Sequence, residues 1–202
     1  MNVAGILQTA FEPLFPAPRQ VWQSFVDAGE IVRLGKEAVL KANHTVERYF
    51  YFILRGSGGV LLWNRNNFIC IDISYENEIL CDFMSFLQQT PSPIEVITFE
   101  DSELLRMSKT HYDKLTQSGI GADISRACSD ALFMHKQQQQ IDILTKTAKE
   151  RYTELQHRQT HLLQKIPQKY VASYLGITPQ SLSRIRAELA QNPSRAELVT
   201  IR

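Results

Sequence analysis

The sequence predicts an α+β protein in which a β-rich N-terminal part is followed by a long helix and an all-helical C-terminal domain. Short β-type runs separated by turn signals occupy residues 39–108. Apolar residues with a heptad spacing follow over residues 120–141, and residues 168–186 have a pattern typical of two helices joined by a tight turn. We therefore divide the chain into a β-barrel at residues 1–118, a long helix at 119–145 and a helical domain at 146–202.

The composition is that of an ordinary globular protein. Of the 202 residues, 44% are hydrophobic and 21% are charged, which excludes a disordered or collagen-like chain. No apolar run approaches the roughly 18 to 20 residues of a membrane span, and the N-terminus lacks the basic flank of a signal peptide. The three cysteines lie far apart, which indicates a cytoplasmic protein, and no clustered ligand set predicts a metal site or a cofactor.

Charge is distributed unevenly along the chain. Residues 165–202 contain six basic and two acidic side chains, a net charge of +4, whereas residues 1–164 have a net charge of −3. A polyanionic partner is therefore expected to bind the C-terminal end.

The β-rich part follows a predicted helix and first strand at residues 19–36. Arg48–Leu54 and Val60–Trp63 have β-type composition, and the glycine-rich residues 55–59 between them predict a hairpin link. Three further strands and one short helix are expected, at Phe68–Ser74, Ile94–Phe99, Leu104–Ser108 and Asp82–Gln88 respectively. Brief strands at this spacing predict a small barrel or jelly roll.

Residues of the predicted long helix follow a 4-3 spacing. The seam consists of Ile120, Ile124, Ala127, Ala131, Met134 and Ile141, with the polar Gln138 at the position between the last two. Such a stripe is typical of a helix that pairs with a copy of itself, so we predict a homodimer. The alternative is a helix that packs against its own barrel.

The most informative segment runs from Gln168 to Arg186. Two helices that cross steeply need a small residue at their contact, which Ala172 supplies, and a turn residue that tolerates a positive φ, which Gly176 supplies four positions later. Thr178 is a good N-cap, and Pro179 stands at the first helical position, where a missing N–H costs nothing. These features predict a helix-turn-helix, although a helical hairpin without a ligand is the simpler alternative.

Polar side chains of this segment are of the types that contact base edges and phosphates in double-stranded DNA. The candidates are Gln168, Lys169, Thr178, Gln180, Ser181, Ser183, Arg184 and Arg186. Gln180 and Arg184 are four residues apart, so they project from one helix face and are expected to read bases, whereas Lys169 is placed for a phosphate. A dimer that presents two such helices is expected to bind an inverted repeat.

The sequence Y-V-A-S-Y-L-G-I-T-P-Q-S-L-S-R-I-R at residues 170–186 resembles the recognition signature of the Crp/Fnr family of bacterial transcription regulators. Y-F-Y-F-I-L-R-G at residues 49–56 is similar to a strand-and-glycine block of that family's barrel, and E-D-S-E-L-L-R-M-S at residues 100–108 to its closing strand. The resemblance covers residues 20–187. It implies a cyclic-nucleotide-binding-like jelly roll, a dimer that regulates transcription, and RNA polymerase as a candidate partner.

Residues 78–93, which begin at Glu78, resemble the cassette in which cyclic-nucleotide-binding members of the family hold their ligand. In those members a Gly-Glu pair opens the cassette and an arginine near its end pairs with the phosphate. The chain departs from this pattern at all three positions. Cys81 stands at the glycine position, Asp82 at the glutamate position and Ser92 at the arginine position. A cyclic phosphate would lack its cationic partner there, so we expect no binding of cyclic AMP, and the effector is an unknown small molecule or none. After Arg186 the sequence predicts a reduced or absent β-hairpin wing.

Two other function classes stay open at this point. One is an effector-binding or protein-interaction domain that has lost DNA binding, which would show no affinity for any duplex at low salt. The other is an enzyme built on the barrel. That class needs converging histidine and carboxylate ligands, and the β-rich part offers only His44, so no catalytic residue is assigned and we expect a protein that is not an enzyme.

Overall fold

A computed structural model describes residues 2–65, 67–117, 119–158 and 163–191. The helices and strands are, in chain order, α1 (Val3–Phe11), α2 (Arg19–Asp27), β1 (Glu30–Leu34), β2 (Val39–Lys41), β3 (Tyr49–Arg55), β4 (Gly58–Asn64), β5 (Asn67–Ser74), β6 (Ile79–Leu80), α3 (Phe83–Gln88), β7 (Ile94–Thr98), β8 (Ser102–Ser108), α4 (Lys109–Thr116), α5 (Gly119–Thr145), α6 (Ala148–Arg158), α8 (Gln168–Leu175) and α9 (Pro179–Gln191). Within these described ranges, none of the helices has the length and apolar character that crossing a membrane would require.

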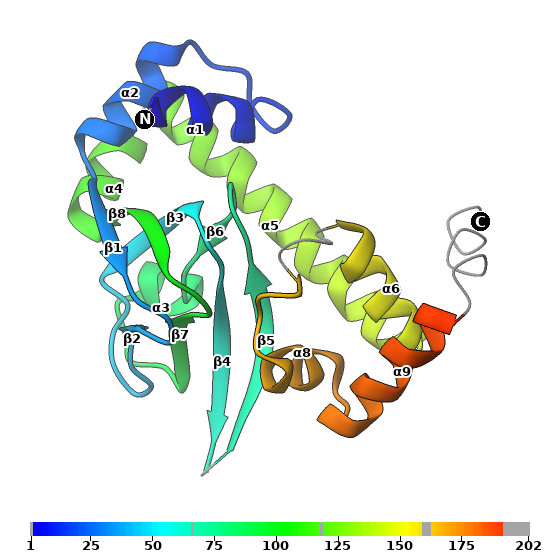
Figure 1. Cartoon of the computed structure of the whole chain (residues 1–202). Coiled ribbons are helices and arrows are strands. Elements are labelled where there is room, and N and C mark those ends of the chain that lie inside the picture. Colours follow the sequence, from blue (N-terminus) through cyan, green and yellow to red (C-terminus); the bar gives the residue numbers. More distant parts are fainter. Residues whose placement is uncertain (1, 66, 118, 159–162, 192–202) are drawn as a thin grey trace.

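The strands form two four-stranded antiparallel sheets with the orders β1-β8-β3-β6 and β2-β7-β4-β5 (Figure 1). This arrangement is a jelly roll, and we refer to the two sheets together as the barrel. The predicted fold class, a β-barrel followed by a long helix and helical C-terminal elements, is confirmed. The predicted wing falls on residues 192–202, which lie outside the described residues.

The hairpin expected at residues 55–59 is wrong, because β3 and β4 belong to different sheets. The hairpin partner of β4 is β5, with Asn64 opposite Asn67. The glycines serve close packing between the sheets instead. A Cβ atom at Gly58 would clash with the Leu80 side chain and with the carbonyl oxygen of Ile97.

Both outer faces of the barrel are covered by helices. Because side chains alternate along a strand, Val60 points between the sheets while Leu61 points outward to the C-terminal helices. On the other sheet, Phe52 and Leu105 point outward and pack with α1 and α2. Helix α1, which the sequence patterns did not predict, begins after Asn2, whose side chain accepts a hydrogen bond from the Gly5 N–H at 3.1 Å.

Helix α5 runs alongside the barrel from the N-terminal helices to α6 and α9 (Figure 1). Its side chain Ile124 is only 4% exposed and belongs to the core formed with α1, α2 and the barrel. Ile120, Met134 and Ile141 are exposed. The residues of the predicted seam are therefore divided between a barrel-facing side and a solvent-facing side.

The C-terminal helices share a hydrophobic core with the outer face of the β2-β7-β4-β5 sheet. The Tyr170 ring stacks on Phe99 with centroids 4.6 Å apart. The Cys70 N–H on β5 donates a hydrogen bond to the Ser173 hydroxyl of α8 at 2.9 Å. Helix α8 is thus docked against the barrel, as its position beside β5 in Figure 1 shows.

Candidate nucleic-acid interface and barrel cavity

Helices α8 and α9 are joined by a turn whose geometry follows from three residues. Gly176 has a φ of +69°, in the left-handed region that favours glycine, and its N–H donates to the Ser173 carbonyl at 3.0 Å. Thr178 caps α9, because its Oγ1 accepts a hydrogen bond from the Ser181 N–H at 3.2 Å. Pro179 is the first residue of α9. The turn, the cap and the helix start all lie where the sequence predicts them.

The two helices are held together by a small apolar core. Val171, Ala172, Leu175 and Leu182 are buried, and Ile177 and Ile185 pack against them. Ala172 is only 1% exposed and belongs to this core, so a small residue fills the position that the sequence predicts for the helix contact. The helix-turn-helix is therefore a packed unit whose polar residues are left on its surface.

The predicted DNA-binding residues of α9 differ in their partners. Gln180, Ser183 and Arg184 are exposed on α9 and form no hydrogen bond with another described residue. Ser181 is half-buried and receives a hydrogen bond from the Thr178 hydroxyl at 3.1 Å. Arg186 instead donates from Nε to the Tyr152 hydroxyl of α6 at 3.0 Å, which directs it toward the neighbouring helix.

At the start of α8, Gln168 is exposed and Lys169 is paired with the barrel. The Lys169 Nζ lies 2.8 Å from the Glu37 Oε1, and the Tyr170 hydroxyl donates to the same oxygen at 3.0 Å. The hydrogen bond from Lys169 lowers the pKa of Glu37 below its ordinary value. The lysine that the sequence places at a phosphate is thus held by a carboxylate of this chain.

The polar residues Asp82 and Ser92 of the predicted cassette bind each other and Lys41 of β2. The Lys41 Nζ lies 3.0 Å from the Asp82 Oδ2, and both side chains are at least 96% buried. The Ser92 hydroxyl donates to the same Asp82 oxygen and accepts from the Lys41 Nζ at 2.8 Å. The Lys41 Nζ also donates to the Ile94 carbonyl at 2.6 Å. Sequence reasoning missed Lys41, whose only signal is a cation between the apolar residues Leu40 and Ala42.

The other two cassette residues also have protein partners. The Cys81 thiol donates to the Tyr49 carbonyl with a sulfur–oxygen distance of 3.6 Å, and burial raises its pKa well above the ordinary value. The Glu78 Oε2 accepts from the Tyr75 N–H at 3.0 Å. Across the described chain, no group of three or more His, Cys, Asp or Glu side chains could hold a metal ion.

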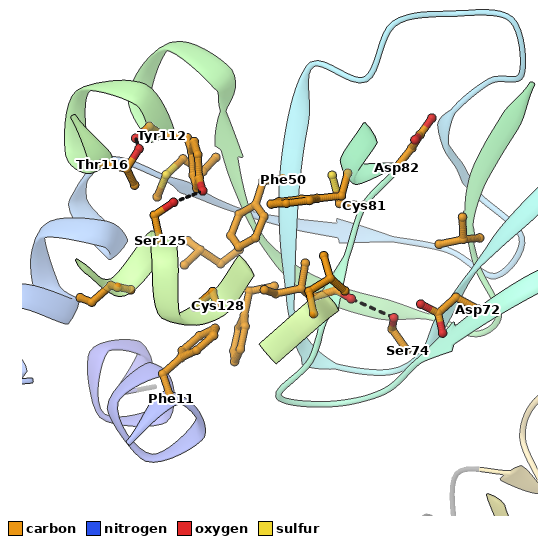
Figure 2. Close-up of a pocket in the computed structure, with 18 of the residues that line it drawn as sticks. Phe11, Phe50, Asp72, Ser74, Cys81, Asp82, Tyr112, Thr116, Ser125 and Cys128 are labelled. Atoms are coloured by element: carbon orange, nitrogen blue, oxygen red, sulfur yellow. Dashed lines mark hydrogen bonds between the residues drawn. The ribbon is translucent and has the colours of Figure 1, made fainter. Parts of the chain in front are cut away.

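A cavity of about 410 Å³ lies between α1, α2, the barrel, α4 and α5. Its walls are mainly apolar, and Figure 2 shows Phe11, Phe50, Cys81 and Cys128 among the side chains that line it. The Tyr112 hydroxyl and the Ser125 hydroxyl of its wall are hydrogen-bonded to each other at 2.7 Å (Figure 2). Sequence reasoning missed this cavity, because its walls come from segments far apart in the chain.

No protein-family model and no curated protein matches the sequence. Solved structures of similar shape do match. FixK2 from Bradyrhizobium japonicum is 12% identical with a TM-score of 0.69, over 82% of this chain and 86% of that chain. The c-di-GMP-responsive global regulator CLP of Xanthomonas campestris is 12% identical with a TM-score of 0.65, over 87% and 93%. The catabolite activator protein of Thermus thermophilus is 16% identical with a TM-score of 0.55, over 90% and 88%. These proteins are Crp/Fnr regulators. The chain has the Crp/Fnr fold.

Within this Crp/Fnr fold, α5 carries a solvent-facing apolar row at its C-terminal half. Phe133 and Leu144 are 65% and 77% exposed, and Met134 and Ile141 are exposed beside them. Ala127 and Ala131 of the predicted seam are half-buried. Large apolar side chains that gather on one helix face in this way are typical of a surface that packs against another protein.

Proposed function

We propose that this chain is a dimeric, sequence-specific DNA-binding transcription regulator of the Crp/Fnr type. One observation carries the proposal: a packed helix-turn-helix presents Gln180, Ser183 and Arg184 in solvent. Gln and Arg side chains pair with adenine and guanine edges in the major groove, and each such contact discriminates between bases by about 1–3 kcal/mol. The protein is expected to act in the cytoplasm, with double-stranded DNA and RNA polymerase as partners.

The dimer surface that we propose is the exposed row of α5, formed by Phe133, Met134, Ile141 and Leu144. It includes Met134 and Ile141 of the predicted seam but not Ile124, which is buried in its own barrel core. Pairing two copies along this row would remove apolar area from water at about 25 cal/mol per Å². It would also place two α9 helices symmetrically, which an inverted repeat requires.

We further propose that the cassette does not bind cyclic AMP. The Asp82 carboxylate is neutralised by Lys41, and Ser92 is hydrogen-bonded to both. A cyclic phosphate would have to break this buried ion pair or be buried without a cation, and either step is costly.

A second candidate function is an effector-binding protein that no longer binds DNA. The observation that favours it is the docking of α8 on the barrel, where Glu37 forms an ion pair with the Lys169 ammonium. This reading predicts an intact dimer with no affinity for any duplex.

Selection of binding sites from random duplexes at low salt separates the two functions. A regulator is expected to select an inverted repeat with half-sites about one helical turn apart, roughly 34 Å. The variant Gln180→Ala with Arg184→Ala should lose the selected motif, whereas the matched control Arg33→Ala on β1 should retain it. If no motif emerges while light scattering shows a dimer, the DNA-binding proposal is wrong and the effector-binding alternative holds.

A further inference from the structure

We infer that the barrel cavity binds an uncharged, mainly apolar molecule, such as a long-chain ketone or ester. The inference rests on the proposed function only in naming this molecule the effector. The cavity volume of about 410 Å³ falls within the range of roughly 300–1,000 Å³ that is typical of small-molecule sites.

The polar groups of the cavity wall have little to offer a charged ligand. Asp82 is paired with Lys41, and Asp72 is paired with Lys136 at 2.5 Å. The Ser74 hydroxyl donates to the Ile79 carbonyl at 2.8 Å. A phosphate, carboxylate or ammonium group would therefore lose its hydration without gaining a free partner of opposite charge.

Burial in the same cavity disfavours charge on the thiols that line it. It raises the pKa of Cys128 to about 11, and it raises that of Cys81 as well. Both thiols are thus neutral near pH 7 and act as apolar wall atoms. The aromatic rings of Phe11 and Phe50, which face the cavity in Figure 2, extend this apolar surface.

A tryptophan ring of α2 extends the apolar wall. Trp22 of α2 lines the cavity and is only 2% exposed, and its indole Nε1 forms no hydrogen bond with any described residue. Its ring is held by stacking on Phe11, with centroids 5.2 Å apart. The Nε1 atom has almost no accessible surface, so Trp22 contributes ring carbons to the wall rather than a donor for a ligand.

The cavity also adjoins the helix that contacts the helix-turn-helix. Ile124, Cys128 and Leu132 of α5 line it, and further along α5 the Gln139 side chain donates to the Tyr174 hydroxyl of α8 at 3.2 Å. A molecule in the cavity would therefore contact the element that links the barrel to α8, as an effector must.

Tryptophan fluorescence tests the inference directly, because the chain has two tryptophans and only Trp22 lines the cavity. In the Trp63→Phe variant, titration with 2-octanone, 2-decanone and 2-dodecanone should give a saturable change in Trp22 emission. Each added methylene group should tighten binding about fourfold, the equivalent of about 0.8 kcal/mol. Decanoate at pH 8 should bind at least about tenfold more weakly than 2-decanone, since its charge must be buried.

Variants of the two tryptophans form a matched pair for calorimetry with 2-decanone. The Nε1 of Trp63 is also buried without a partner among the described residues, but Trp63 does not line this cavity. Trp22→Leu should weaken ketone binding by about two- to tenfold, as expected for the loss of about 20–55 Å² of apolar contact, whereas Trp63→Phe should leave it unchanged. Cys128→Phe should fill the cavity and abolish binding, and circular dichroism shows whether that variant folds.

Three results would overturn the inference: no saturable signal with any ketone, an affinity that does not depend on chain length, or tighter binding of decanoate than of 2-decanone. If Cys128→Phe does not fold, the chain-length series and the tryptophan pair still decide. Site selection with DNA separates this inference from the proposed function. Selection of an inverted repeat without ketone binding refutes the cavity inference alone, and ketone binding without any DNA affinity refutes the regulator alone.

Discussion

The polar side chains of α9 and those of the nucleotide cassette differ in where their hydrogen bonds go. Gln180 and Ser183 on α9 are exposed and form no hydrogen bond with another described residue. In the cassette, Asp82 and Ser92 are buried and bonded to Lys41 and to each other. Both regions lie in one chain with the Crp/Fnr fold, but their polar side chains differ in exposure and in hydrogen bonding.

The two regions differ in the free energy that ligand binding would cost. An exposed amide or hydroxyl is hydrated, so it can exchange water for a base edge at little cost. A buried group that is already satisfied must break a protein contact before it can bind anything, and a buried ion pair is especially costly to open. We therefore expect the α9 side chains to bind a polar ligand such as DNA and the polar cassette side chains to bind none. The apolar cavity would then bind a different class of molecule.

The largest effect is expected from Lys41→Met, which leaves the Asp82 carboxylate buried without its cation. Breaking a buried pair by removing one partner typically costs about 3–5 kcal/mol, so the free energy of unfolding should fall by that amount in urea denaturation. The double variant Lys41→Met with Asp82→Asn should recover most of the loss, because no charge is then left unpaired. If the single and double variants lose equal free energy of unfolding, the unpaired Asp82 charge is not the cause of the loss.

A second effect is expected from Glu47, which lies beside the same pair. Burial raises the pKa of Glu47 to about 7 from 4.5, although the Tyr49 N–H and Lys41 favour the carboxylate. The native state therefore binds a proton more tightly than the unfolded state, so the free energy of unfolding should fall as pH rises from about 4.5 to 7 and level off above that. The size of the fall is about 3 kcal/mol.

Glu47→Gln has no titrating group at this position and should lack the fall. Urea denaturation of both proteins at pH 5 and pH 8 measures the difference, with the change between the two pH values compared rather than the absolute stabilities. An identical pH dependence in the two proteins would mean that Glu47 is ionised in the native state throughout.

The local features of the helix-turn-helix could be predicted from the sequence because each depends on neighbours in the chain. Gly176 and Thr178 act through hydrogen bonds that span at most five residues, and both lie where the pattern places them. The longer strands β3, β4, β5, β7 and β8 were also predicted, since period-2 alternation and turn residues are local signals, whereas the short strands β2 and β6 were missed. The degenerate cassette stays a prediction, and it rests on a resemblance to the Crp/Fnr pattern rather than on a local signal.

Long-range features could not be predicted in the same way. Nothing local indicates that β3 and β4 belong to different sheets, and the glycines between them suggested a hairpin. The heptad spacing of α5 does not say which face packs on the barrel, so Ile124 and Met134 appeared equivalent although one is buried and the other exposed. Lys41 and Asp82 are neighbours only through the sheet, so the cation that neutralises the cassette was missed.

The two arginines of α9 differ in hydrogen bonding in the same way, although they lie on one helix. Arg184 forms no hydrogen bond among the described residues, whereas Arg186 is bonded to the Tyr152 hydroxyl at 3.0 Å. Arg184→Ala should therefore weaken binding to the selected operator by about 1–3 kcal/mol and leave binding to random DNA nearly unchanged. Arg186→Ala should instead lower the free energy of unfolding by about 0.5–1.5 kcal/mol and leave the sequence preference intact. Fluorescence anisotropy and urea denaturation measure the two effects, and a loss of sequence preference in Arg186→Ala would reverse the assignment.

The smallest effect is expected at Lys169, which is both a predicted DNA contact and part of an ion pair within the chain. Its ammonium is a predicted phosphate contact, but it is paired with Glu37 of the barrel, and the two side chains are 53% and 44% exposed. A pair this exposed contributes at most about 1 kcal/mol, so DNA phosphates can compete for the lysine. Glu37→Gln removes the competing charge while its amide oxygen can still accept from the Tyr170 hydroxyl, so binding to random duplex DNA should tighten by up to about fivefold. Lys169→Ala should weaken binding to operator and random DNA alike and make the salt dependence shallower by roughly one unit of slope.

The matched control is Glu103→Gln, which removes one barrel carboxylate that is paired with Arg33 rather than with α8. Anisotropy titrations over a salt series compare the three variants. If Glu37→Gln and Glu103→Gln tighten binding equally, only net charge matters and Lys169 does not reach a phosphate. If Glu37→Gln alone tightens it, and the gain disappears when Lys169→Ala is added, the barrel restrains a DNA contact through this one ion pair.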